Sequence, residues 1–251
     1  MQEQLLPGMK SENRPDLMSR IFQMKLKAIE EELYKNGIFG KCVAHLRVIE
    51  FQKRGLPHAH ILIILDEKDR IRTAEQVDDI VSAQIPPHPN TIFDEDERQQ
   101  SIKRQQMKRL RDIVLKHMVH GPCGSDNPTA PCMYNRNGDV TQVRSKGFPK
   151  KFVAETFVDP KNSYVTYQRR VPGSGKHEAL VHDRPIVNGW IVPFRPYLPL
   201  KYDCHINVEV CASTKAAKYL HKYVSKGGDR AMVNVSSDGT PVGRNEVKEF
   251  Q

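Results

Sequence analysis

The sequence predicts an α+β protein, because helical and strand-like periodicities alternate along the chain. Residues 16–35 repeat apolar side chains at helical spacing, and Asn36-Gly37 follows as a stop signal. Residues 42–51 (CVAHLRVIEF) and 58–65 (HAHILIIL) are rich in β-branched residues and flank a polar turn. We therefore expect a helix followed by an antiparallel hairpin.

Three more helices are expected further along the chain. Residues 73–83 begin with Thr73 and Gln76 at capping-box spacing. Residues 94–118 start acidic and become basic, a pattern that is usually the solvated face of a helix. Residues 213–226 (STKAAKYLHKYVSK) start with Ser or Thr as a candidate N-cap and are followed by two glycines.

The stretch 120–185 is irregular, with Gly, Pro, Asn and Asp throughout, and it is too long for a passive loop. We interpret it as an inserted subdomain with short strands, followed by strands at 186–194 and 205–211. Four regions are therefore expected: residues 1–119 with the hairpin, the cysteine-containing insertion 120–185, residues 186–230 with the last strands and the final helix, and a polar tail at 231–251.

The charge balance favours a phosphate-bearing partner. Lys and Arg number 39 against 30 Asp and Glu, which gives a net charge of +9. A basic enzyme of another kind or a ribosome-associated protein is the alternative. The sequence has no apolar run of about 18 residues and no signal-peptide core at its start, so we expect no membrane association. Five cysteines, an odd number, are typical of reduced thiols in an intracellular protein.

His58 and His60 are candidate ligands of one divalent cation, because residues i and i+2 of a strand point to the same face. Two imidazoles leave a metal under-coordinated, so a third ligand is needed. Glu50 and Gln52 on the preceding strand share a face, and either can approach across the hairpin. A carboxylate with two imidazoles suits Mg²⁺ or Mn²⁺ with positions open for phosphate oxygens. Alone, such a pair is more often structural.

Tyr219 and Tyr223 lie four residues apart and so occupy one face of the expected final helix. A phenolate can attack a phosphodiester and store the bond energy as a phosphotyrosine link. Lys222 and Lys226 lie close by, where either can stabilise developing phosphate charge or lower the pKa of a tyrosine. Packing against a core is the alternative role of such a tyrosine pair.

Together these motifs resemble the Helitron transposases. EFQKRGLPHAHILIIL (residues 50–65) looks like the metal-binding motif of that family, and KYDCHINVEVCASTKAAKYLHKYVSKG (201–227) is similar to its two-tyrosine motif. Four other segments resemble the family in the expected order, so the likeness runs through nearly the whole chain: NRPDLMSRIFQMKL (13–26), HGPCG (120–124), PCM (131–133) and KGFPKKF (146–152).

The resemblance implies a HUH nuclease domain of the replication-initiator type, with a central antiparallel sheet flanked by helices and a core related to ferredoxin-like and RNA-recognition folds. It implies nicking and rejoining of single-stranded DNA at transposon ends in rolling-circle transposition, and a nuclear location. His58 and His60 would bind the metal, with Glu50 preferred over Gln52 as third ligand. Tyr219 and Tyr223 would be the nucleophiles that form the 5′-phosphotyrosine, with their separate roles left open.

The chain departs from this family at two points. Relatives usually carry a cysteine two residues before KGFPKKF, where this sequence has Arg144. Cys123 and Cys132, with His120 or His117, remain candidate zinc ligands but are short of a strong fourth ligand. Full-length relatives continue into a helicase, which is not expected within these 251 residues.

PGSGKH (residues 172–177) is only superficially like a phosphate-binding loop. The Walker A pattern requires Gly and Ser or Thr where this sequence has Arg170 and His177, so we expect neither ATP binding nor helicase activity. Lys53 and Arg54, just before the histidine strand, are candidate contacts to DNA phosphates; a solvated turn is the alternative.

Two other functions stay open. One is a decayed or domesticated Helitron fragment that binds nucleic acid without transposing. The other is a nucleic-acid-binding module on a sheet like that of RNA-recognition domains. This last function predicts exposed aromatic residues on sheet faces, and the expected strands contain few of them.

Overall fold

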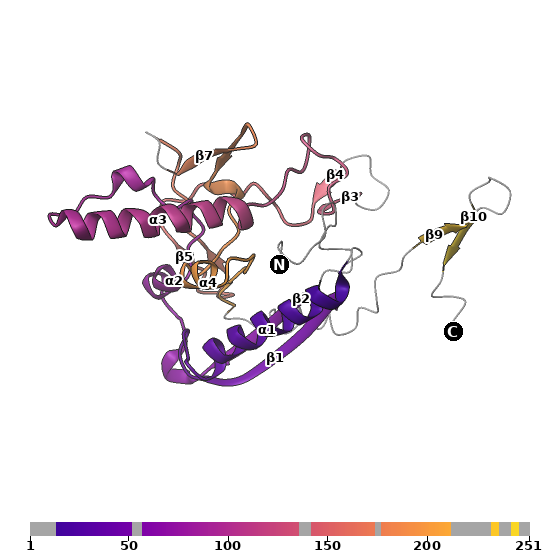
Figure 1. The fold of residues 1–251 in the computed structure, drawn as a ribbon, viewed down its shortest axis with the longest axis horizontal. Helices are drawn as coiled ribbons and strands as arrows, with labels where there is room; N and C mark the ends of the chain where they lie inside the picture. Colours follow the sequence, from indigo (N-terminus) through magenta and orange to yellow (C-terminus); the bar gives the residue numbers. More distant parts are fainter. Residues whose placement is uncertain are drawn as a thin grey trace. The chain divides into compact units, whose positions relative to one another are not determined.

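Helices and short antiparallel strands alternate along the chain, which confirms the α+β class (Figure 1). The computed structural model describes residues 14–51, 57–135, 142–173, 177–211, 232–235 and 242–245. The chain divides into two units, the hairpin unit (residues 1–70 and 214–251) and the middle unit (residues 71–213). No helix in the described ranges is both long and apolar enough to cross a bilayer.

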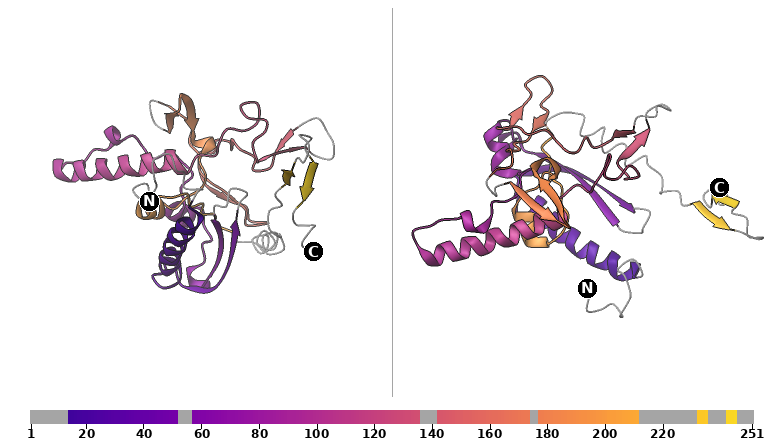
Figure 2. Two further views of the ribbon diagram at one scale, coloured as in Figure 1. Left: turned by 45° about the vertical axis from the view of Figure 1, so that its right-hand side comes forward. Right: turned by 90° about the horizontal axis from the view of Figure 1, so that it is seen from above.

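The hairpin unit places helix α1 (Pro15–Tyr34) along one face of strands β1 (Cys42–Phe51) and β2 (Pro57–Leu65) (Figures 1 and 2). Pro15 stands in the first turn, where its missing N–H costs nothing. The Tyr34 ring stacks on His45 with centroids 3.9 Å apart. Arg47 donates to Glu30 at 2.6 Å. These two contacts fix which face of the hairpin the helix covers.

The opposite face of the hairpin carries the residues that alternate with His45 and Arg47 along β1, and their partners on β2. Val48 pairs with His60, and Glu50 pairs with His58. Because side chains alternate across a strand, all four lie opposite the face that α1 covers. Farther along the same face, Leu46 is 45% exposed, so this surface is only partly covered. The hairpin unit also contains the short 3₁₀ helix η3 (Glu67–Asp69). Near the C-terminus it contains a separate antiparallel pair, β9 (Met232–Val235) and β10 (Val242–Asn245).

The middle unit packs one long helix against loops and small hairpins. Its core gathers apolar side chains from α3, from the loop before it and from the segment around residue 190. They are Ile85, Leu110, Val114, Met118, Ile186, Ile191 and Phe194. The elements are α2 (Ala74–Ile80), η4 (Pro89–Thr91), α3 (Glu97–His117), β3 (Met133–Asn135), β4 (Gln142–Arg144), β5 (Phe157–Val158), β6 (Val165–Thr166), β7 (Glu178–Val181), β8 (Arg184–Val187), η5 (Asn188–Trp190) and α4 (Tyr197–Tyr202).

Two buried polar residues join three distant segments of this unit. The side chain of Asn188 accepts from the Ile85 N–H at 2.7 Å and donates to the Arg170 carbonyl at 2.8 Å. The Arg169 guanidinium donates to the carbonyls of Ala83, Asn188 and Ile191. Burial lowers the pKa of Arg169 to about 10, so the guanidinium stays charged at neutral pH. These side chains thus supply hydrogen-bond donors to buried backbone carbonyls that have no partner in a neighbouring strand.

The local signals predicted the helices well. Helix α1 spans 15–34 against an expected 16–35, and α3 spans 97–117 against 94–118. The capping box of α2 is present, with the Gln76 N–H donating to the Thr73 hydroxyl and the Thr73 N–H donating to the Gln76 side chain. The expected helix at 213–226 lies outside the described residues.

The strand expectations hold only in part. Residues 205–211 form no strand, because Val208 donates its N–H to the Pro193 carbonyl and Val210 donates to the Tyr167 hydroxyl. Within 186–194 the strand β8 stops at residue 187 and a 3₁₀ turn follows. Each described strand pairs with one other strand only. Of the expected central sheet, the described residues therefore show just the pair β1–β2.

Replacement of Asn188 by Ala should lower the free energy of unfolding by about 2 kcal/mol, because the Ile85 N–H and the Arg170 carbonyl both lose their partner. Chemical denaturation measures this loss. The matched control is Asn207→Ala, whose exposed side chain donates to Glu209 and should change stability by less than about 0.5 kcal/mol. Equal losses in the two variants would contradict the role of Asn188.

Candidate metal centres

Glu50, His58 and His60 come together on one face of the β1–β2 hairpin. Oε2 of Glu50 lies 3.1 Å from Nε2 of His60, and the rings of His58 and His60 are 5.9 Å apart between centroids. The side chains of His60 and Glu50 are 18% and 19% exposed. The hairpin register therefore places a carboxylate and two imidazoles on one half-buried face, with Glu50 in contact with His60.

The structure locates only part of the predicted catalytic set. It places Glu50 beside the histidines, whereas the alternative third ligand, Gln52, lies outside the described residues. The remaining candidates also lie outside them, so their expected roles stay predictions. They are Lys53, Arg54, Tyr219, Lys222, Tyr223 and Lys226.

A second group of metal-binding side chains lies in the middle unit. One ligand atom from each of His120, Cys123 and Cys132 lies within 4.8 Å of the others. The residues come from the loop after α3 and from the turn before β3. The other expected histidine, His117, has its Nε2 atom 3.2 Å from Oδ1 of Asp203. Of the two histidines that the sequence left open, His120 is therefore the one beside the cysteines.

The His120 ring is held inside a column of aromatic and cationic groups. It stacks on Phe148, with centroids 4.4 Å apart, and is nearly parallel to Trp190 at 6.4 Å. Lys150 caps the Phe148 ring at 5.0 Å, and Arg184 caps the Trp190 ring at 4.3 Å. Sequence spacing gave no sign of this column, because its members lie up to 70 residues apart along the chain. The column fixes the plane of the imidazole.

The electrostatics of His120 favour the neutral ring that a metal requires. Burial, with the nearby cations Lys146, Lys150 and Arg184, lowers the pKa of His120. Its Nε2 atom is buried and has no hydrogen-bond partner in the part of the chain that the structure describes. A buried, unpaired nitrogen costs about 1–3 kcal/mol, and a metal ion would satisfy it.

The thiols lie in a mixed electrostatic environment. Burial and the hydrogen bond with Cys132 raise the pKa of Cys123, while Arg144 and Arg184 act to lower it. Arg144 lies against the next residue, since a Cβ added at Gly124 would come 2.1 Å from its guanidinium. Arg144, where the resemblance described above implies a cysteine, is therefore next to this His–Cys–Cys group.

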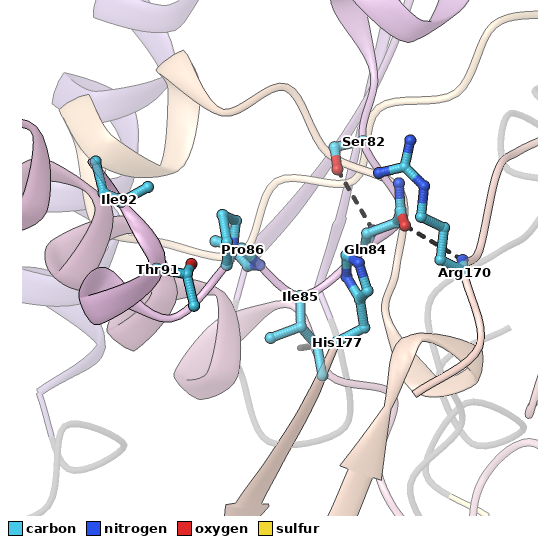
Figure 3. A pocket seen from close by; sticks show the side chains of 9 residues that line it. Ser82, Gln84, Ile85, Pro86, Thr91, Ile92, Arg170 and His177 are labelled. Carbon is cyan, nitrogen blue, oxygen red and sulfur yellow. Dashed lines mark hydrogen bonds between the residues drawn. The ribbon is translucent and has the colours of Figure 1, made fainter. Parts of the chain in front are cut away.

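A cavity of about 530 Å³ opens elsewhere in the middle unit (Figure 3). Its wall is apolar at Ile85, Pro86 and Ile92, and Gln84 and Arg170 lie on its polar side, where the Gln84 side chain accepts from the Arg170 N–H at 3.2 Å. Arg170 and His177, the residues that break the Walker A pattern, both line it. The other lining residues are Ser82, Pro87 and Thr91.

Comparison with known protein families finds a similarity at the start of the chain. Residues 1–63 match the family described as the Helitron helicase-like domain at the N-terminus. A search of curated proteins found no match. The matched range includes α1, β1 and most of β2, and with them Glu50, His58 and His60. The His–Cys–Cys group and the two tyrosines lie beyond it. Over residues 1–63 the chain is thus similar to the Helitron helicase-like N-terminal domain family.

Proposed function

We propose that this chain nicks and rejoins single-stranded DNA as a metal-dependent endonuclease and strand transferase of rolling-circle transposition. One observation carries the proposal: Glu50, His58 and His60 share one face of a hairpin inside the segment that matches the Helitron family. A half-buried cluster of two imidazoles and a carboxylate is suited to a divalent ion that must also contact a phosphate.

The spacing of the Glu50 and His60 side chains supports Mg²⁺ or Mn²⁺ as the proposed ion. Two ligands of one octahedral ion, each about 2.1 Å from it, lie about 3 Å apart. The Glu50 and His60 atoms are 3.1 Å apart, so both can bind the same ion with little rearrangement. When bound, the ion polarises the scissile phosphate. Glu50 also orients the His60 ring before any ion arrives.

Tyr219 and Tyr223 are the proposed nucleophiles. The phenolate oxygen of one tyrosine attacks phosphorus, the bond from phosphorus to the 3′-oxygen breaks, and that oxygen takes up a proton and leaves as a 3′-hydroxyl. The DNA stays attached as a 5′-phosphotyrosine, and the reverse reaction rejoins it. Lys222 and Lys226 would stabilise phosphate charge, and Lys53 and Arg54 would hold the DNA backbone.

We also propose a structural Zn²⁺ in the middle unit, bound by His120, Cys123 and Cys132. The buried, unpaired Nε2 of His120 and the two adjacent thiols fit a nitrogen-and-sulfur site. Three protein ligands leave one tetrahedral position to water, because Arg144 cannot bind the ion. Zn²⁺ would therefore bind more weakly here than at a site with four protein ligands.

A decayed or domesticated fragment that binds nucleic acid without transposing is the second candidate. The observation that favours it is Arg144, which lies beside the His–Cys–Cys group in place of a fourth ligand. In either case the proposed location is the nucleus, and a helicase domain such as full-length relatives carry would supply strand separation.

The purified chain, incubated with labelled single-stranded oligonucleotides and Mn²⁺, should form a covalent protein–DNA adduct that survives a denaturing gel. His58→Ala should abolish it through loss of the metal, and Tyr219→Phe/Tyr223→Phe through loss of both nucleophiles. His45→Ala is the matched control, since it removes an imidazole from the opposite face of the same hairpin. It should leave the adduct intact.

Absence of an adduct, with DNA binding retained at low salt, would reject the nuclease in favour of the second candidate. An adduct that persists in the double tyrosine variant would instead reject the assigned nucleophiles.

Glu50→Gln should weaken Mn²⁺ binding at least tenfold, because an amide is a poorer ligand than a carboxylate and no longer offsets the charge of the ion. Isothermal titration with Mn²⁺ measures the affinity, and Gln52→Ala serves as the control that should leave it unchanged. The opposite pattern would make Gln52 the third ligand.

The chain as purified should retain about one zinc ion, measured by elemental analysis. Cys132→Ser should release it, whereas Cys211→Ser, at an exposed thiol, should not. Arg144→Cys should supply a fourth ligand and slow removal of zinc by a chelator at least tenfold. Zinc content that is indifferent to Cys132→Ser would eliminate this site.

A further inference from the structure

A loop in the middle unit, residues 144–151, has only positively charged side chains among its ionisable groups. It begins with the last residue of β4 and contains Arg144, Lys146, Lys150 and Lys151, without any Asp or Glu. Arg144, Lys146 and Lys151 are exposed, and Lys150 is half-buried. This segment, here called the basic loop, therefore presents three cations to solvent.

The backbone of the basic loop is fixed at both ends and in its middle. The Ser145 N–H donates to the Cys132 carbonyl at 2.7 Å, and the Lys150 N–H donates to the Gly189 carbonyl at 2.8 Å. Between them the Phe148 ring is 8% exposed and belongs to the aromatic column. A loop held in this way loses little conformational entropy when a ligand binds to its exposed side chains.

The cations of the basic loop lie close enough together to repel one another. The Lys150 ammonium donates to the Lys146 carbonyl at 2.8 Å, and the charge of Lys146 helps to lower the pKa of Lys150. Among the described residues, the charges that act on the neighbouring His120 ring are all positive, from Lys146, Lys150 and Arg184. An anion bound here would relieve this repulsion.

The carboxylates near the basic loop leave its two leading cations unneutralised. Asp126 lies 3.3 Å from the Arg184 guanidinium, and Glu209 acts on Lys150. In the part of the chain that the structure describes, neither Arg144 nor Lys146 forms an ion pair with a carboxylate. The local charge therefore selects an anionic ligand at these two side chains.

We propose that the basic loop binds backbone phosphates of single-stranded DNA through Arg144 and Lys146, whatever the base sequence. A guanidinium matches two phosphate oxygens in a fork, and an ammonium contacts a phosphate as a point charge. The choice of DNA over another polyanion rests on the proposed function. The inference gives the middle unit a contact to the strand that is separate from Lys53 and Arg54.

The salt dependence of oligothymidylate binding tests this contact, measured by fluorescence anisotropy without added Mg²⁺ or Mn²⁺. Each phosphate contact to a single strand contributes about 0.7 to the slope of log Kd against log salt concentration. Arg144→Gln/Lys146→Gln should therefore lower the slope by about 1.4 and weaken binding at low salt at least tenfold. Arg144→Lys/Lys146→Arg keeps both charges and should retain most of the slope.

The matched control is Arg98→Gln/Lys108→Gln, which removes two exposed cations from α3. It changes the net charge equally and should lower the slope by less than about 0.5. Equal effects of the two glutamine variants would overturn the proposal, because net charge alone would then explain them. So would an unchanged slope in the loop variant, or a parent chain that does not bind oligothymidylate.

Two further ligands test the chemistry of the contact. Oligodeoxycytidylate should lose as much affinity as oligothymidylate in the loop variant, since phosphates and not bases are bound; a loss confined to one of them would overturn the proposal. Polyglutamate should compete poorly with the oligonucleotide. Competition at equal charge concentration, lost in the loop variant, would assign the basic loop to an acidic protein segment instead.

These outcomes are independent of the nuclease. Binding without added Mg²⁺ or Mn²⁺ requires neither the metal of the hairpin unit nor the tyrosines, so a chain that forms no adduct still tests the basic loop. Conversely, an adduct that forms normally at saturating DNA in the Arg144→Gln/Lys146→Gln variant leaves the nuclease standing whatever the anisotropy shows.

Discussion

The alternation of side chains along paired antiparallel strands determines which groups meet in both units. In the hairpin unit it gives one face to α1, through Tyr34 stacked on His45, and leaves Glu50, His58 and His60 together on the other. A shift of the register by one residue would turn His58 and His60 to the face opposite Glu50 and so separate the candidate ligands. In the middle unit the same alternation buries Val165 and exposes the rings of Phe157 and Tyr164.

Features set by neighbours in sequence could be predicted, and those set by distant contacts could not. Thr73 and Gln76 form the capping box that their spacing indicated. The strand expected at 205–211 was wrong, because its N–H groups donate to Pro193 and to the Tyr167 hydroxyl, the latter 43 residues away. The proximity of Glu50 to the histidines followed from the hairpin alone. Helical and strand periods report local geometry, whereas the tertiary partners of a short apolar segment lie outside any window of sequence.

The candidate zinc ligands illustrate the same limit. Sequence put His120 first and kept His117 as an alternative, since both stand near the end of the same helix. Asp203, 86 residues away, lies beside His117, and the column formed with Phe148 and Trp190 holds His120. Only the folded chain separates the two. By contrast, the substitution at Arg144 was visible in the sequence, and the structure adds that its guanidinium lies beside Gly124.

That guanidinium alters the charge of its surroundings. With the proposed zinc bound, the two thiolates would cancel the charge of the ion and the imidazole would be neutral, so that these groups together with Arg144 would sum to +1. A cysteine thiolate at the same position would make the sum −1. Arg144 therefore makes the surroundings of the group two charge units more positive than a cysteine thiolate would, on an already basic protein. On the proposals above, a weaker hold on the metal and a stronger hold on a polyanion would have a common origin in one side chain.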